Sequence, residues 1–361
     1  MRIGRTPLLG LAAFAALAFL APAASRAADW SPALQNVIAA AKAEGKLTLS
    51  TSVNVAGGAD GAKAMQAGIA KMFGLSLDMD WAPALSFGPM AAKIQQEFQA
   101  GVKASSDIYI GAAPHLGPYI DSDLFKKVDW AALWPERIPA SAAERGRSLR
   151  FETFLPGIMY NVKSAPWVKD IKVVDDVMKP AYKGKFYTTP YLSGFDALVA
   201  DSAWGKAKTT AFVQKLSGQI AGVVACTGTD RIASGEIPAL VVDCSGAAPN
   251  LPRYKGILDV QVPNDIAMRR YVYVQVPSNA PHPNAGILAA LYLVSVEGQH
   301  DVAFGMDGID EDDYPETWTH QRVATLTNQG AKFLNVDINW WKTNPEADKD
   351  FGDIVKILQK N

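Results

Sequence analysis

Apolar and polar positions in the first part of the chain alternate between two periods. Some segments repeat apolar residues every three or four positions, as helices do, and others alternate residue by residue, as strands do. Strands are expected at 46–52, 75–81 and 106–112, and helices at 31–44, over the residues that end near Gly74, and from Ser86 to Gly101. This order of strands and helices predicts a parallel sheet with helices on its faces.

The second half of the chain continues the same alternation. Strands are expected at 156–163, 184–190, 221–227, 238–244 and 271–279, a helix opens within 191–200, and another covers 282–299. The pattern therefore predicts an α/β protein throughout.

The N-terminus has the composition of a secretory signal peptide. Arg2 and Arg5 precede an apolar run over 8–20, and small residues follow Pro22 up to an expected cleavage after Ala27. A membrane anchor is the alternative, but the run is shorter than the roughly 20 apolar residues that span a bilayer. Residues 1–27 are thus predicted to be a signal peptide that delivers the chain to the periplasm.

Charge and length limit the partners and the domain count. Removing Arg2, Arg5 and Arg26 with the signal peptide changes the formal net charge from −1 to −4, which disfavours nucleic acid and anionic membranes as partners. The remaining residues, 28–361, exceed the usual size of one hydrophobic core, so two lobes are expected.

The only two cysteines of the sequence are Cys226 and Cys244. In an oxidising compartment such a pair favours a disulfide, and two free thiols are the alternative. Their spacing does not match a CxxC redox motif or a zinc site. The sequence also lacks a P-loop, a GxSxG elbow and an HExxH motif, so no catalytic residue, cofactor or metal ligand is predicted.

Several segments together resemble one protein family. They are AKAEGKL at 41–47, Tyr160-Asn161, DDVMKPAYKGKFYTTP at 175–190 followed by Ser193-Gly194, and APHPNAGILAALYLVSVEGQ at 280–299. The chain resembles the extracellular solute-binding proteins of bacterial ABC importers, in the branch that includes periplasmic ferric-ion and small-solute binding proteins. The resemblance extends over nearly the whole chain after the signal peptide.

The resemblance implies a type II-like, two-lobe periplasmic binding protein fold. Each lobe would be a mainly parallel sheet with flanking helices, and hinge strands would cross between the lobes. The implied boundaries are 28–155 plus 276–335 for lobe 1, 156–275 for lobe 2, and 336–361 for a C-terminal helical segment that packs on either lobe. The implied partners are a small-molecule ligand and a permease with its ATPase at the inner membrane, and the protein would be a monomer without catalytic activity.

The ferric-ion binding members of this family branch indicate which residues an iron ligand would require. In its ferric members adjacent tyrosines hold the iron, whereas this sequence has Val242-Asp243-Cys244 at the corresponding place. A small anionic or zwitterionic organic solute is expected if the helix N-termini expected at Ser86 and Ser193 dominate the cleft, and an amine if Asp243 dominates it. Ferric-ion binding is the alternative within the family, and a secreted enzyme using a free cysteine near His115 is the alternative outside it.

Candidate ligand residues are those expected at the carboxyl ends of strands and at helix N-termini, where ligands bind in α/β folds. They are Ser52, Asn54, Trp81, Ser86, Phe87, His115, Tyr191, Ser193, Gly194, Phe195 and Asp243. Each has an ordinary structural alternative. The serines are equally suited to N-capping, the aromatic side chains to core packing, and His115 to a position on the surface.

Overall fold

The computed structural model describes residues 30–52, 58–84, 87–135, 138, 142–192, 194–225, 228–242, 254–301 and 318–358. Contacts divide the chain into two units, Met1–Trp30 and Ser31–Asn361, and the fold described below belongs to the second. Among the helices of these ranges, none combines the length and the apolar character needed to cross a bilayer.

The first sheet holds seven of the strands in the described residues, in the order β2-β1-β3-β11-β5-β4, with β12 paired to β11. The strands are β1 (Lys46–Ser52), β2 (Asp78–Ala84), β3 (Ile108–Ala112), β4 (Ala143–Glu144), β5 (Ser148–Phe154), β11 (Met268–Gln275) and β12 (Leu334–Val336). β1 is parallel to β2 and β3, as the sequence predicts.

The second sheet has the order β10-β6-β9-β7-β8. Its strands are β6 (Ile158–Asn161), β7 (Phe186–Thr188), β8 (Gly222–Val223), β9 (Ala239–Val241) and β10 (Leu258–Gln261). β7 is parallel to β8 and β9, whereas β6 is antiparallel to β9 and β10.

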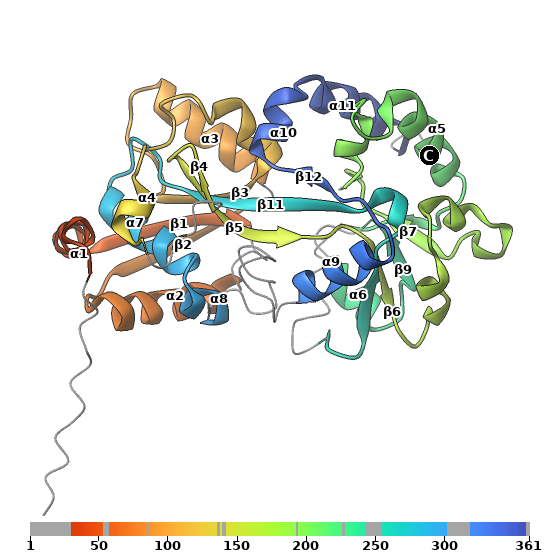
Figure 1. Ribbon diagram of the computed structural model, residues 1–361, viewed down its shortest axis with the longest axis horizontal. Helices are drawn as coiled ribbons and strands as arrows, with labels where there is room; N and C mark the ends of the chain where they lie inside the picture. Colours follow the sequence, from red (N-terminus) through yellow and green to blue (C-terminus); the bar gives the residue numbers. More distant parts are fainter. Residues whose placement is uncertain are drawn as a thin grey trace, which may run out of the picture. The chain divides into compact units, whose positions relative to one another are not determined.

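Helices accompany both sheets (Figure 1). The α-helices are α1 (Pro32–Glu44), α2 (Gly58–Phe73), α3 (Phe87–Gln99), α4 (Trp130–Leu133), α5 (Gly205–Ser217), α6 (Thr229–Ala233), α7 (Pro283–Leu293), α8 (Val296–Asp301), α9 (Trp318–Asn328), α10 (Ile338–Thr343) and α11 (Glu346–Leu358). The 3₁₀ helices are η2 (Ala113–His115), η3 (Gly117–Tyr119), η5 (Pro166–Asp170), η6 (Val174–Met178), η7 (Pro180–Tyr182), η8 (Asp196–Val199) and η12 (Asn264–Ile266).

Local signals explain how α1 begins and ends. The Ser31 hydroxyl accepts a hydrogen bond from the backbone N–H of Leu34 at 3.1 Å, and Pro32 occupies the first turn. Gly45 closes the helix with φ of +69°, a left-handed conformation that costs glycine little. β1 then starts at the next residue, so the predicted helix and strand are both confirmed.

Both sheets are mixed, which corrects the expectation of mainly parallel sheets. β11 runs antiparallel to both β3 and β5, and β6 runs antiparallel to both β9 and β10. β5 and β6 are joined by residues 155–157 alone, and β10 and β11 by 262–267. These short connections lead from one sheet directly into the other. β6 and β11 therefore enter their sheets antiparallel to the neighbouring strands β9 and β3.

Two segments differ from the boundaries expected for the lobes. β11 falls within the range expected for lobe 2, but it hydrogen-bonds to β3 and β5 of the first sheet because the chain has crossed before residue 268. α9 falls within the range expected for lobe 1. Its Val323 and Leu326 share an apolar cluster with Met159 and Val260 of the second sheet, since burying this face of α9 requires those partners.

The C-terminal segment packs against elements of both sheets rather than on one lobe. α10 contacts η2 and η3, which follow β3, and Lys342 forms an ion pair with Asp121. α11 contacts α5 and η8, and Lys206 Nζ of α5 lies 2.6 Å from Asp350 Oδ1. In this structure, residues 338–358 thus connect the first sheet's loops to the helices near β7.

The segment at 280–299 that carries much of the family resemblance has a clear structural role. The Glu44 carboxylate accepts hydrogen bonds from the backbone N–H groups of Asn284 and Ala285 at 3.2 and 2.7 Å, which caps the first turn of α7. The buried Asp107 carboxylate accepts the backbone N–H of His282 at 2.6 Å. The resembling residues therefore fix the start of α7.

Asn161, the second residue of the Tyr160-Asn161 motif, also fixes structure. Its amide nitrogen donates to the carbonyls of Ile232 and Ala233 at 3.1 and 2.9 Å, and its amide oxygen accepts the N–H groups of Lys163 and Ser164. Each hydrogen-bonding capacity of this buried amide is used, so Asn161 ties the end of β6 to α6.

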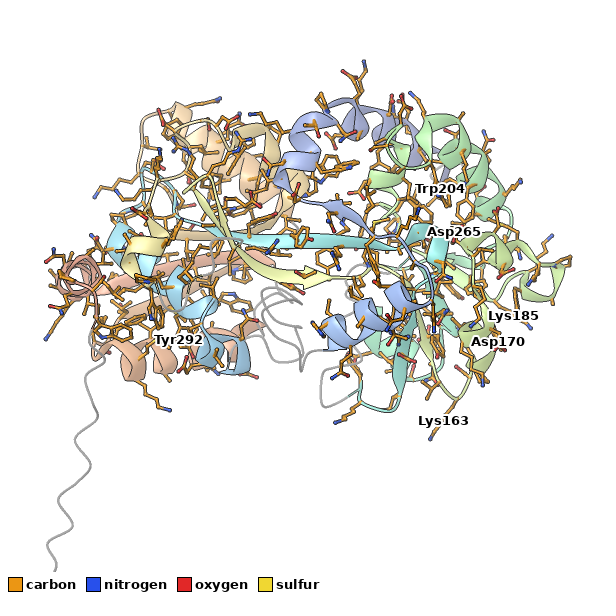
Figure 2. The ribbon with its side chains drawn as sticks, in the orientation of Figure 1. Lys163, Asp170, Lys185, Trp204, Asp265 and Tyr292 are labelled. Carbon is orange, nitrogen blue, oxygen red and sulfur yellow. The ribbon has the colours of Figure 1, made fainter. Side chains whose placement is uncertain are left out.

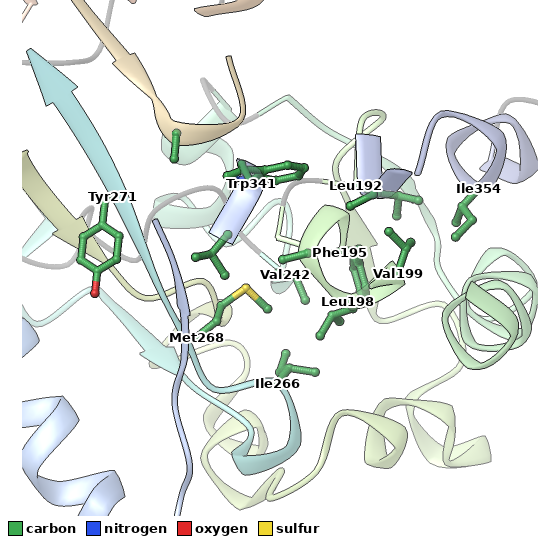
Figure 3. Packing of buried hydrophobic residues seen from close by; sticks show 14 of the residues in the cluster. Leu192, Phe195, Leu198, Val199, Val242, Ile266, Met268, Tyr271, Trp341 and Ile354 are labelled. Atoms are coloured by element: carbon green, nitrogen blue, oxygen red, sulfur yellow. The ribbon is translucent and has the colours of Figure 1, made fainter. Parts of the chain in front are cut away.

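Close helix packing and one apolar cluster hold these elements together. A Cβ at Gly68 of α2 would lie 1.8 Å from the Tyr292 hydroxyl of α7, so only glycine permits this approach. Trp204 donates from Nε1 to the carbonyl of Asp265 at 3.1 Å; these two residues and Tyr292 are labelled in Figure 2. Figure 3 shows Trp341 of α10 in the same buried cluster as Leu192 and Met268.

Candidate functional site

The predicted ligand residues divide by where the structure places them. Ser52 is the last residue of β1, Trp81 lies in β2, Phe87 is the first residue of α3, and His115 ends η2 after β3. These four residues follow or approach the carboxyl edge of the first sheet, as expected. Asn54, Ser86, Ser193, Cys226, Asp243 and Cys244 lie outside the described residues.

Phe87 is held at this edge by a buried tyrosine. The Tyr109 hydroxyl of β3 donates to the Phe87 carbonyl at 3.0 Å, and the Tyr109 ring stacks on Phe125 with centroids 6.2 Å apart. The ring lies over Gly111, where a Cβ would approach the Tyr109 hydroxyl to 2.3 Å. Burial raises the pKa of Tyr109 far above its usual value, so the phenol keeps the proton that it donates.

His115 lies against the first turn of α3. Its ring and that of Phe87 have centroids 6.5 Å apart at 55°, and a Cβ at Gly88 would be in ordinary van der Waals contact with His115 Cε1 at 3.6 Å. The side chain is partly buried rather than on the open surface. The structure thus brings Phe87 and His115 together.

A buried ion pair from the second half of the chain reaches the same place. Arg270 of β11 binds the Asp196 carboxylate of η8 with both guanidinium nitrogens, and the Nη2–Oδ2 distance is 2.6 Å. The two side chains are only 7% and 13% exposed. This bidentate geometry fixes η8 against the first sheet.

The charges around His115 come from three other elements. Burial lowers the pKa of His115; Arg270 lowers it further, whereas Asp196 and Asp348 oppose the shift. The ring is therefore neutral at pH 7, and the site offers an imidazole that both donates and accepts hydrogen bonds.

The turn before η8 corrects the expected helix start at 193–195. Leu192 and Gly194 have φ of +46° and +87°, and these left-handed conformations interrupt a helix. Only the four-residue η8 follows, and the long helix α5 starts at Gly205. A Cβ at Gly194 would lie 2.4 Å from Val242 Cγ1 and 3.1 Å from Pro156 Cβ, so this glycine serves close packing.

The two aromatic candidates beside this turn lie in different environments. Phe195 is fully buried, with its ring centroid 5.6 Å from that of Phe212, so it has the core position given as its alternative. Tyr191 is 44% exposed, the surface that a ligand contact requires. Its ligand role remains a prediction.

Sequence reasoning missed Thr51, Asp196 and Arg270. Thr51 is fully buried at the end of β1, and only tertiary structure shows the surroundings of its hydroxyl. Arg270 did carry a signal, because a basic residue inside the apolar strand 268–275 must find an anionic partner when it is buried.

Two further features of the described residues bear on the site. Among the described residues, no group of three or more His, Cys, Asp and Glu side chains is arranged to hold a metal ion. A groove of about 230 Å³ lies between residues 199–201 and 343–350, and none of the predicted ligand residues lines it.

Comparison with known proteins supports the fold. The chain matches no family model and no curated protein sequence. It is similar to several solved structures at 15–16% identity.

Three of these structures are binding proteins. The substrate-binding protein of an ABC transporter from Agrobacterium tumefaciens aligns over 87% of this chain and 94% of its own, with a TM-score of 0.68 and 15% identity. AgtB from A. tumefaciens R10, in complex with agropinic acid, aligns over 87% of this chain and 98% of its own, with a TM-score of 0.64 and 15% identity. Iron-bound HitA from Pseudomonas aeruginosa aligns over 86% of this chain and 99% of its own, with a TM-score of 0.63 and 16% identity. The chain therefore has the two-lobe α/β fold of the periplasmic binding proteins of ABC transporters.

Proposed function

We propose that this chain is the periplasmic solute-binding component of an ABC transporter. It captures a small organic solute between its two sheets and delivers it to an inner-membrane permease and its ATPase, acting as a monomer without catalytic activity. The observation that carries the proposal is that both halves of the fold contribute to one site. Phe87 and His115 follow strands of the first sheet, and the buried Arg270–Asp196 pair, which joins β11 to η8, acts electrostatically on His115.

The proposed route to the periplasm is the signal peptide at 1–27, which the sequence supports through its basic start, its short apolar run and its small residues near Ala27. The proposed disulfide between Cys226 and Cys244 depends on this route, since a pair of cysteines oxidises stably outside the cytoplasm. Titration of thiols in unreduced protein tests both the disulfide and the cysteine-enzyme alternative.

An anionic or zwitterionic solute is the class that we favour. Similar structures include AgtB in complex with agropinic acid and a GABA receptor, and both of these compounds carry a carboxylate. The charge of Arg270 is matched by Asp196, and His115 is neutral, so recognition of a carboxylate here would rest on neutral hydrogen-bond donors. Neutral donors bind anions well where water is excluded.

The test is a thermal-shift series on the mature protein with 4-aminobutyrate, agropinic acid, putrescine and ferric citrate. A compound present at 100 times its Kd stabilises the native state by about 2.7 kcal/mol. We expect one of the two carboxylates to raise Tm. A rise with ferric citrate but not with citrate free of iron would establish the iron alternative that the HitA similarity suggests. No rise with any of the four compounds would count against solute binding of this class.

A further inference from the structure

We propose that Thr51 and Trp81 form a two-donor subsite that receives an oxygen acceptor, such as a carboxylate, of the bound solute. The inference rests on the proposed function and deepens it, because it specifies what part of the solute the first sheet recognises.

Register and strand alternation place the two side chains on the same sheet face. Leu49 of β1 pairs with Trp81 of β2, and Thr51 is two residues further along β1. Side chains alternate across a strand, so Leu49, Thr51 and Trp81 share a face. This is the buried face, because Leu49 is 1% and Thr51 0% exposed. The Cα atoms of Thr51 and Trp81 are therefore separated by one strand spacing, about 4.8 Å, across the sheet and by two residues, about 6.6 Å, along the strand.

Both side chains carry a buried donor that the fold does not use. Thr51 Oγ1 and Trp81 Nε1 are enclosed, and neither finds a hydrogen-bond partner among the described residues. A buried polar group left unsatisfied costs about 1–3 kcal/mol, so two such groups on adjacent strands call for an explanation. Thr51 Oγ1 and Trp81 Nε1 are not the sole buried atoms of this kind. Ser106 Oγ and Asn279 Oδ1, for example, also lack partners among the described residues, and both lie near the amino end of β3, away from the edge where ligands bind.

Two other buried threonines show what the fold does elsewhere. The Thr188 hydroxyl at the end of β7 donates to the Val241 carbonyl at 2.7 Å. The Thr209 hydroxyl of α5 lies 3.0 Å from the carbonyls of Leu198 and Gly205. Thr51, equally buried, differs in having no protein acceptor, which fits an acceptor supplied by a ligand.

The hydrogen-bonding chemistry of Thr51 and Trp81 determines which group of the solute can bind to them. Indole N–H is a donor only, so Trp81 cannot bind an ammonium group through Nε1. A carboxylate has two oxygens and can accept from both donors at once, and such bonds gain strength in a site from which water is excluded. Trp81 lies on the edge strand β2 and is partly exposed as a residue, although its Nε1 atom is enclosed.

The experiment combines affinity with stability in the full mature protein. Thr51→Val keeps the shape and removes the hydroxyl, and Thr188→Val makes the same change where the hydroxyl is bonded. The probe is whichever of 4-aminobutyrate and agropinic acid raises the wild-type Tm. We expect Thr51→Val to raise the midpoint of urea unfolding without solute and to weaken calorimetric binding of the probe at least tenfold. Thr188→Val lowers the midpoint and leaves the Kd unchanged.

Two further variants separate the donors from the shape of the site. Thr51→Ser restores the hydroxyl and recovers most of the affinity lost in Thr51→Val. Trp81→Phe keeps an aromatic ring without the N–H, and we expect it to weaken binding of the probe severalfold. Unchanged affinity in Thr51→Val or in Trp81→Phe would overturn the two-donor subsite.

The wild-type series keeps the two proposals distinguishable. If putrescine, which has no oxygen, is the compound that binds, solute binding stands and the subsite is wrong. If none of the four compounds binds, solute binding of the proposed class is contradicted, and the subsite is contradicted with it.

Discussion

The carboxyl edges of the two sheets each end near a fully buried threonine, and the two hydroxyls differ in what they bind. Thr188 of β7 donates to the Val241 carbonyl of β9, whereas the hydroxyl of Thr51 in β1 has no acceptor among the described residues. Gly194 packs tightly beside the second edge, with no room for a Cβ. The second edge is satisfied by its own contacts, and the first retains donor capacity.

This difference suggests that the edges of the two sheets have different roles. An edge that is fully bonded and tightly packed provides a rigid surface, and an edge with unused donors provides recognition. Each of the following changes tests one side of that contrast, beginning with the contact that joins the two sides.

Asp196→Asn should have the largest effect, since it leaves the buried Arg270 charge without its counterion. Breaking a buried pair in this way costs about 3–5 kcal/mol of unfolding free energy. Urea denaturation measures the loss. The double variant Asp196→Leu with Arg270→Met removes both charges and should recover much of it. A loss below about 1 kcal/mol for Asp196→Asn would show that the pair contributes little.

Gly194→Ala should come next. The added methyl group meets Val242 at 2.4 Å, and φ of +87° disfavours any side chain. We expect a loss of about 1–3 kcal/mol from overpacking and about 1–2 kcal/mol from the backbone. Gly184→Ala is the matched control, because its φ of +73° is similar and no atom lies within 4 Å of its added Cβ. Equal losses in the two variants would show that packing at Gly194 is loose.

Thr188→Val should lower the free energy of unfolding by about 1–2 kcal/mol, because the Val241 carbonyl loses its donor in a buried place. Thr51→Val should have the opposite sign, since it removes a hydroxyl without a partner. Chemical denaturation of the two variants side by side checks the signs. Destabilisation of both variants to the same extent would erase the contrast between the edges.

The smallest effect at neutral pH should come from His115. Its pKa is lowered in the folded state, so near pH 6.5 the unfolded chain takes up a proton that the folded protein does not. The free energy of unfolding should therefore fall as pH drops below about 6.5, by at most about 1.4 kcal/mol per pH unit from this group. His115→Gln should flatten that part of the profile, and an unchanged slope would exclude His115 as its source.

Local signals made much of the fold predictable. Ser31, Pro32 and Gly45 set the ends of α1 through contacts with their own turn. The strand at 46–52 followed from alternation, and so did β2, although it covers Asp78–Ala84 rather than the expected 75–81. The helix expected to open within 191–200 is reduced to the four-residue η8, because Gly194 adopts a left-handed conformation and packs against Val242 and Pro156, of which Val242 is distant in sequence.

The site was less predictable for the same physical reason. Phe87 and His115 were predicted because ligand edges follow parallel strands, a rule that sequence order reveals, and their ligand role stays a prediction. Phe195 is buried and Tyr191 is exposed because of how the chain folds over each ring, which local composition does not encode. An unbonded hydroxyl such as that of Thr51 is defined by the absence of a neighbour, and only the assembled sheet shows it.

The C-terminal helices have a mechanical consequence. α10 contacts η2 and η3 near the first sheet, and α11 contacts α5 and η8, so the chain ties the two sheets together beyond the short β5–β6 and β10–β11 connections. Each added tie restricts the directions in which one half can rotate against the other. A rotation of one sheet against the other would therefore have to bend the chain at residues 344–345, which join α10 to α11, or break one of these contacts.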